Sequence, residues 1–315
     1  MSDGSTGSVR PVESIRGLAV LAEPPTEAHE AVARALGLSR VPSAADYSDV
    51  FLFQLYPYAS VHLGPEGMMG GEARARVAGF WRALGLEAPE EPDHLSALLG
   101  LYATLAENPS PTEDAVALLR RSGRGALLHE HLAPWLFQFA ERVAELSRGF
   151  YGAWARLLDD VFRTEVEDGA EAGFDPTMLP VHLREAPTLP DPREEGATAF
   201  LSGLLAPVRS GLLLARADLA RISSELDLGL RAGERRYAME SLLSQDAPGV
   251  LVALARESRR QGALHAARVG WLGATARFHA DRADRTAELL DDLARQHSTV
   301  TTAAAVPRGE GSSEQ

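Results

Sequence analysis

Apolar residues recur at intervals of three and four along almost the whole chain, a spacing that places them on one face of successive α-helices. The sequence contains no convincing run of alternating β-branched residues, which would indicate a β-strand. The spacing therefore predicts an all-α fold, a bundle of about ten helices. A chain of 315 residues is long enough to bury one or two sizeable cores.

Breaks in the helical pattern divide the chain into five segments. Residues 1–25 and 298–315 are expected to be poorly ordered, because the first ten residues are small and polar and residues 298–315 lack apolar periodicity. Helical patterns fill residues 26–162 and 196–297. Between them, residues 163–195 hold five prolines and nine acidic residues, which predicts a hinge or a long surface loop. A loop of this length would allow two copies to exchange domains, so a homodimer is one expectation.

Individual helices have recognisable signals. Ser43 with Asp46 three residues later predicts a helix N-terminus ahead of an apolar run. One long central helix is expected from about Pro134, and a last helix over about residues 263–295. The central helix would carry, on its apolar face, Trp135, Phe139, Val143, Leu146, Phe150 and Leu157.

Charge and composition exclude several classes of function. The net charge of −13 argues against a nucleic-acid partner and favours cationic ligands, such as a peptide with adjacent arginines. The chain has no cysteine, and all 31 basic residues are arginine, which excludes thiolate chemistry, a Schiff-base lysine and a phosphate-binding loop. No apolar stretch approaches the roughly 20 residues of a membrane span, so we expect a cytoplasmic protein that does not insert into membranes.

The acids and histidines give weak signals for catalysis. Glu91 and His94 have the Glu-x-x-His spacing of di-iron bundles, but no second copy of that spacing exists. His129 and His131 are two residues apart and would diverge on a helix. A metal- or nucleotide-dependent hydrolase remains an alternative if His94, His129, His131 and nearby acids converge in three dimensions. A helical scaffold without client specificity is a third possibility.

Two longer motifs are more distinctive. The first is Glu90-Glu91-Pro92-Asp93-His94-Leu95, which opens an apolar helical run. Proline and acids suit the first turn of a helix, but His94 does not, because a cation is disfavoured at that end. The second motif is His131-Leu132-x-x-Trp135, followed by Phe139 and then by Phe150-Tyr151.

In this order and at this spacing, the two motifs resemble the signature of the TorD/DmsD/NarJ family of redox-enzyme maturation chaperones. The resemblance extends from about Asp46 to Leu158. It implies an all-helical chaperone, without enzymatic activity or cofactor, that binds the precursor of a molybdenum oxidoreductase. The client would be of the DMSO reductase, nitrate reductase or formate dehydrogenase type, held through a twin-arginine signal peptide or its immature N-terminus until cofactor insertion and export.

The resemblance also implies which residues contact the peptide. Those of the first motif are Glu91, Pro92, Asp93 and His94, with the Asp93 carboxylate binding a guanidinium. In the second motif, His131 and Trp135 either line the groove or pack in the core, where the indole N–H needs a partner. Phe53 and Tyr56 would border an apolar groove for the hydrophobic part of the peptide. Arg235 and Arg236 are expected on a solvated helix face, in salt bridges with Glu234 or Glu240.

Overall fold

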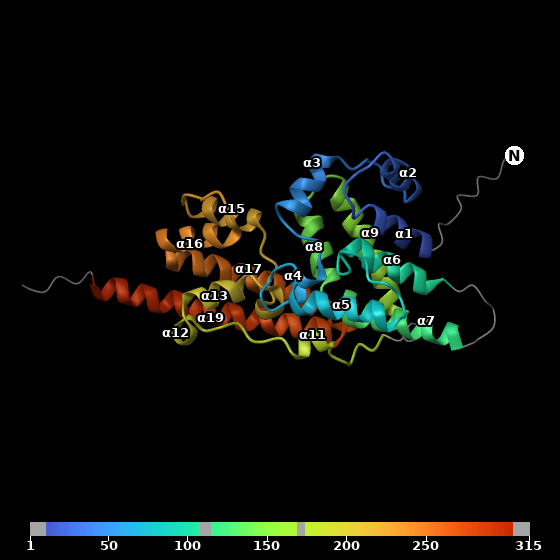
Figure 1. Cartoon of the computed structure of the whole chain (residues 1–315). Helices are drawn as coiled ribbons and strands as arrows, with labels where there is room; N and C mark the ends of the chain where they lie inside the picture. Colours follow the sequence, from blue (N-terminus) through green and yellow to red (C-terminus); the bar gives the residue numbers. More distant parts are fainter. Residues whose placement is uncertain (1–10, 108–114, 169–173, 305–315) are drawn as a thin grey trace, which may run out of the picture.

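The computed structural model describes residues 11–107, 115–168 and 174–304 (Figure 1). These residues form 18 α-helices and two short π-helices and no strand, so the predicted all-α class is confirmed. The expected number of about ten helices is too low, because several long apolar patterns are divided by short breaks. None of the helices in these ranges combines the length and apolar character needed to cross a membrane.

The first half of the chain contains eleven of these elements. In order they are α1 (Pro11–Val20), α2 (Ala28–Ala35), α3 (Ala44–Tyr47), η1 (Ser48–Leu52), α4 (Ala59–Leu63), α5 (Gly71–Ala83), α6 (Leu95–Ala106), α7 (Ala115–Ala126), η2 (Leu127–Leu132), α8 (Leu136–Leu146) and α9 (Phe150–Glu167). The capping box predicted at Ser43 is confirmed, because the Asp46 N–H donates to the Ser43 hydroxyl at 3.1 Å.

The second half begins with short helices and ends with two long ones. In order they are α11 (Val181–Arg184), α12 (Pro192–Glu195), α13 (Ala197–Leu204), α14 (Pro207–Ser210), α15 (Arg216–Glu225), α16 (Arg235–Gln245), α17 (Ala247–Ala267), α18 (Val269–Leu272) and α19 (Ala274–Ala304). The helix expected over residues 263–295 is therefore divided among α17, α18 and α19. Gly273 separates α18 from α19, since its φ of 62° favours glycine and an added Cβ would lie 1.9 Å from the Pro176 carbonyl oxygen.

Two hydrophobic cores stabilise the molecule. The first lies among α1, α6, α8 and α9 and centres on aromatic rings in mutual contact, namely Tyr47, Phe51, Phe139, Tyr151 and Trp154. The second is mainly aliphatic, with Phe200 as its aromatic residue, and lies among α13, α15, α16, α17 and the end of α19. Helix α19 spans both, because Ala276 near its start packs in the first core and Leu290 packs in the second. The two helical parts are thus joined by a continuous helix (Figure 1).

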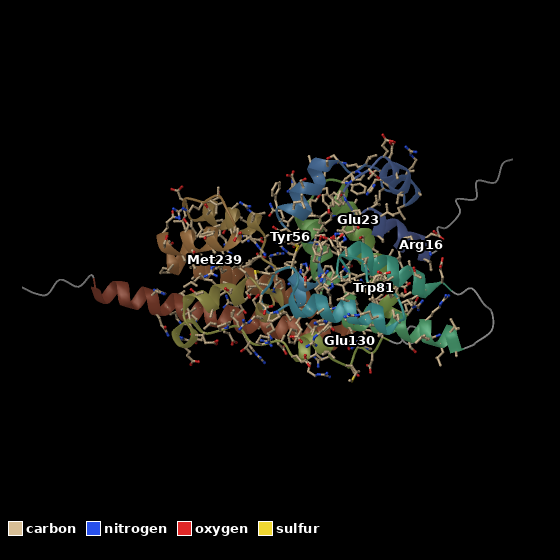
Figure 2. The ribbon with its side chains drawn as sticks, viewed as in Figure 1. Arg16, Glu23, Tyr56, Trp81, Glu130 and Met239 are labelled. Atoms are coloured by element: carbon tan, nitrogen blue, oxygen red, sulfur yellow. The ribbon has the colours of Figure 1, made fainter. Side chains whose placement is uncertain are left out.

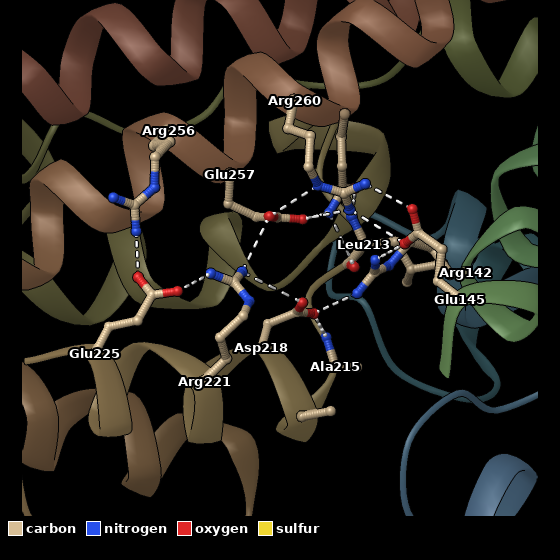
Figure 3. A network of polar contacts seen from close by, with 12 residues as sticks. Arg142, Glu145, Leu213, Ala215, Asp218, Arg221, Glu225, Arg256, Glu257 and Arg260 are labelled. Atoms are coloured by element: carbon tan, nitrogen blue, oxygen red, sulfur yellow. Dashed lines mark hydrogen bonds and ion pairs between the residues drawn. The ribbon is translucent and has the colours of Figure 1, made fainter. Parts of the chain in front are cut away.

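A network of ion pairs also joins the two parts (Figure 3). Arg142 of α8 donates to the buried Asp218 of α15 at 2.6 Å, and its other terminal nitrogen contacts Glu145. Arg260 of α17 pairs with Glu145 at 2.6 Å and with Glu257 at 2.8 Å. We call these five residues the junction network. It cross-links helices from both halves of the chain.

The prediction of one long central helix from Pro134 is wrong. The chain leaves helical geometry at Ser147, and α8 and α9 pack against each other as separate helices. Gly152 permits this tight connection, because a Cβ there would lie 1.9 Å from the Ser147 carbonyl oxygen. The apolar spacing continues through the break because both helices face the same core.

The structure differs in part from the hinge or long surface loop expected over residues 163–195. Helix α9 continues to Glu167, and residues 169–173 lie outside the described ranges. Beyond them, Phe174 and Leu183 are buried in the first core. The Val181 N–H donates to Glu130 at 2.8 Å, and the Ala274 N–H donates to the Pro176 carbonyl at 2.7 Å. The described part of this segment is packed against its neighbours.

The ends of the chain are more helical than expected. Helix α1 lies inside the segment expected to be poorly ordered, with Ile15 and Leu18 fully buried, and the Trp154 indole donates to the Leu18 carbonyl at 3.2 Å. At the other end α19 continues to Ala304, past the expected limit at residue 297. The rest of both predicted tails, residues 1–10 and 305–315, lies outside the described residues.

Candidate functional site

The histidine of the first motif caps helix α6. The backbone N–H of Ser96 donates to Nδ1 of His94 at 3.3 Å, so the ring accepts as a serine or aspartate would at this position. Burial lowers the pKa of His94, against the opposing charges of Glu23, Glu91 and Asp93, and so favours the neutral ring that acceptance requires. This explains a histidine at the positive end of a helix dipole.

The aspartate of the first motif joins α6 to α4. Its carboxylate accepts a hydrogen bond from the Ser60 N–H at 3.1 Å in the first turn of α4, and its backbone carbonyl accepts from the Ala59 N–H at 2.9 Å. The next residue but one, Leu95, donates its N–H to the Pro57 carbonyl at 2.8 Å. Asp93 is only 1% exposed, so its side chain serves these internal contacts.

Helix α5 holds the same loop from the other side. Arg74 donates to the Glu90 carbonyl at 2.6 Å and lies 4.0 Å from the Asp93 carboxylate. The Trp81 indole, labelled in Figure 2, donates to the Pro92 carbonyl at 3.3 Å. The first motif therefore ties together α4, α5 and α6.

The second motif is also internal. The Trp135 indole N–H donates to the backbone carbonyl of His131 at 2.8 Å. His131 is therefore the hydrogen-bond partner of the indole, through its main-chain carbonyl and not through its ring. The Trp135 ring stacks on His62 with centroids 4.7 Å apart. The His131 ring packs against Phe80 and His182, and burial lowers its pKa to about 3. Both side chains belong to the core.

Five of the eight residues predicted to contact a peptide are thus buried, namely Pro92, Asp93, His94, His131 and Trp135. In the folded structure the side chains of these five are shielded from solvent, and their direct contact with a peptide stays a prediction. A residue that caps a helix and a residue that binds a cationic peptide can be of the same type at a helix N-terminus. The sequence alone therefore does not distinguish the two roles. Glu91, Phe53 and Tyr56 do face solvent.

Glu91 has an acidic neighbour that the sequence did not indicate. Glu23, in the turn after α1, hydrogen-bonds to the Ser96 hydroxyl and lies 3.5 Å from Nδ1 of His94 (Figure 2). Burial first, and then the charges of Glu23 and Glu91, raise the pKa of Tyr47 to about 12. We call Glu23 and Glu91 the acidic pair. Among the described residues neither carboxylate has an arginine partner.

Two aromatic side chains lie exposed on the chain that leads to this pair. Phe53 follows η1 and is 54% exposed, and Tyr56 is 37% exposed. From Leu55 to Ala59 burial alternates residue by residue, so Tyr56 and Tyr58 point to the same, outer side. At the far end, burial and a hydrogen bond to Glu91 raise the pKa of Tyr58. Tyr56 and Tyr58 form an outward strip that ends at the acidic pair.

The histidines of the hydrolase alternative have separate surroundings. His94 contacts Tyr58, whereas His129 contacts Phe174 and Glu130 and His131 contacts His182. In the part of the chain that the structure describes, no three metal-ligating side chains form a group able to hold an ion. The convergence that this alternative requires is absent from those residues.

Comparison with known proteins agrees with the position of the two motifs. Residues 20–141 match the family model described as nitrate reductase delta subunit. Among similar curated proteins are the chaperone protein TorD of Vibrio vulnificus strain YJ016 and that of strain CMCP6. Each is 30% identical over 128 residues, which cover 36% of this chain and 58% of the relative. The chain thus spans little more than half the length of these relatives. The segment from residue 20 to 141 carries the first motif and most of the second, and it is similar to the TorD/NarJ family that these motifs resemble.

Proposed function

We propose that this protein is a cytoplasmic chaperone that binds the precursor of a molybdenum-containing oxidoreductase, rather than an enzyme. The similarity of residues 20–141 to the TorD/NarJ family supports the class of client. The bound segment is an arginine-bearing N-terminal stretch, such as a twin-arginine signal peptide. It is held until the client has received its cofactor and no longer presents the segment.

The observation that carries this proposal is the acidic pair. Glu23 and Glu91 are exposed carboxylates with no guanidinium partner in the described residues, on a chain with a net charge of −13. A carboxylate accepts two parallel hydrogen bonds from a guanidinium, which favours arginine over lysine. Adjacent arginines in a client segment would satisfy both carboxylates.

The support beneath the pair is rigid. Glu91 extends from the loop that α4, α5 and α6 hold by hydrogen bonds, and Glu23 is anchored through Ser96. Rigid carboxylates lose little side-chain entropy on binding. Exposed ion pairs are each worth at most about 1 kcal/mol, so apolar contacts must supply the rest of the affinity. Phe53 and Tyr56, which are exposed on the segment that leads to Tyr58, can provide them.

The proposal is tested by calorimetric titration of the full chain with twin-arginine signal peptides from molybdoenzymes. Micromolar binding that is lost when both arginines are replaced by alanine would support it. A peptide with both arginines replaced by lysine is the matched control for charge alone, and it should bind more weakly. A folded protein that binds none of the peptides would contradict the proposal.

A further inference from the structure

Arg235 occupies an unusual position at the junction of the two helical parts. It is the first residue of α16, and its guanidinium donates to the Leu214 carbonyl at 2.6 Å. Leu214 belongs to the second core, while the adjacent Leu213 and Ala215 belong to the first. The sequence predicts a solvated salt bridge for Arg235, but its side chain is half-buried.

No carboxylate of the described residues forms an ion pair with Arg235. The next residue provides a direct contrast, because Arg236 pairs with Glu240 at 2.9 Å and also donates to the Ser202 hydroxyl. The predicted pairing is therefore confirmed for Arg236 and wrong for Arg235. A desolvated cation without a counterion is unfavourable, and its charge is available to an anion that arrives from outside.

One other arginine resembles Arg235 in part. Burial lowers the pKa of both Arg235 and Arg282. Arg282, however, donates to the carbonyls of Ala186 and Pro187 and lies over the Phe278 ring at 4.9 Å. Its donors and its charge are thus satisfied within the fold. Arg235, by contrast, donates to one carbonyl, that of Leu214.

The surroundings of Arg235 connect it to the acidic pair. Tyr56 lies within electrostatic range of Arg235, and Tyr58 on the same outer side reaches Glu91. His62, which is buried, lies within hydrogen-bond distance of the Tyr56 carbonyl at 3.0 Å and so fixes this segment. Positions two apart in an extended chain are separated by about 7 Å. The strip therefore has carboxylates at one end and an uncompensated guanidinium at the other.

We propose that Arg235 binds a carboxylate of the client segment, so that the segment lies along Tyr56 and Tyr58 with its arginines at the acidic pair. This inference rests on the proposed function and adds a requirement to it. The ligand is a peptide with basic residues at one end and an acidic residue at the other. The opposite charges of the strip set the direction in which the peptide lies.

The test uses the full chain and blocked synthetic peptides that carry an Arg-Arg pair, an apolar segment and one aspartate. The aspartate is moved through successive positions on either side of the arginine pair, and each peptide is matched by one with asparagine. At the favoured position the wild type should bind the aspartate peptide about tenfold more tightly than its asparagine match. Arg235→Gln should abolish this ratio, whereas Arg236→Gln should preserve it.

A third peptide makes the test independent of any variant. The peptide with lysine in place of the aspartate should bind the wild type more weakly than the asparagine peptide, because the lysine is repelled by the positive charge of Arg235. Equal binding of the aspartate, asparagine and lysine peptides at every position would overturn the role of Arg235. If that binding still depended on the peptide arginines and on Glu91, the proposed function would stand. Loss of all arginine-dependent binding would overturn both.

Discussion

The Asp93 carboxylate accepts a hydrogen bond from the Ser60 N–H at 3.1 Å, although the two residues are 33 positions apart in the chain. This contact makes Asp93 a cap for α4 supplied from the start of α6. The aspartate of the first motif therefore has a structural role. The proposed recognition of a cationic segment rests on the exposed carboxylates Glu23 and Glu91.

Replacing this buried cap should destabilise the fold. Asp93→Ala leaves the Ser60 N–H without its acceptor and removes the carboxylate 4.0 Å from Arg74, and we expect a loss of about 1–3 kcal/mol in the free energy of unfolding. Urea denaturation measures it, with the exposed Glu288→Gln as a control that should change stability by less than about 0.5 kcal/mol. A variant as stable as the wild type would refute the capping role.

The junction network should be sensitive to loss of one partner. Arg142 and Asp218 are 4% and 7% exposed in their side chains and 2.6 Å apart, so Asp218→Asn removes one of the two carboxylates that pair with the buried Arg142 guanidinium and leaves Glu145 as the other. We expect a cost of about 1–3 kcal/mol. The exposed pair Arg34 and Glu30 is a matched control, for which Glu30→Gln should cost less than about 0.5 kcal/mol. Similar costs at both sites would contradict the structural role of the network.

Acid should destabilise the protein through its buried histidines. Burial lowers the pKa of His62, His182 and His279 to about 4, against an ordinary value of 6.5. Between these values the unfolded chain binds more protons than the folded one, so stability falls as the pH drops from 6.5 towards 4. Each such histidine contributes up to about 1.4 kcal/mol per pH unit.

The cleanest window for this effect is pH 6.5 to 5, where carboxylates in the unfolded chain are still largely ionised. We expect urea-unfolding free energies to decrease steeply across it. His182→Asn should reduce the slope relative to that of the wild type. A slope that does not respond to His182→Asn would show that this side chain does not titrate with unfolding.

Two helical glycines should respond in opposite directions to alanine. Gly152→Ala places a methyl group 1.9 Å from the Ser147 carbonyl oxygen, which we expect to cost about 1–3 kcal/mol. Gly100 in α6 has no atom within 4 Å of an added Cβ, and Gly100→Ala should stabilise by about 0.5–1 kcal/mol. Thermal unfolding of the two variants distinguishes them, and a shift of the same sign in both would contradict the α8–α9 connection.

Local patterns predicted the class of the fold and some helix starts. The capping box of Ser43 and Asp46 depends on residues three apart, and the sequence alone identifies it. The break between α8 and α9 was missed because it depends on the approach of Gly152 to Ser147, while the apolar spacing runs on across it. Helix α1 was missed because its burial depends on the distant helices α6 and α9.

The candidate site was predicted only in part for the same reason. The first motif was found, but its aspartate and histidine point inward because they bond to Ser60 and Ser96. Glu23 gave no signal, since it follows α1 and meets the motif only through the fold. In the sequence Arg235 does not differ from Arg236. Only the fold shows that, among the described residues, Arg235 has no acidic partner.

The most direct test of the account compares peptide affinity in the Glu23→Gln, Glu91→Gln double variant with that in the wild type. Calorimetry with a twin-arginine signal peptide at low ionic strength, where exposed charges are least screened, gives both dissociation constants. We predict at least about a tenfold loss in the double variant and less than about a twofold change in Glu288→Gln. Unchanged affinity in a folded double variant would contradict the acidic pair as the site of arginine recognition.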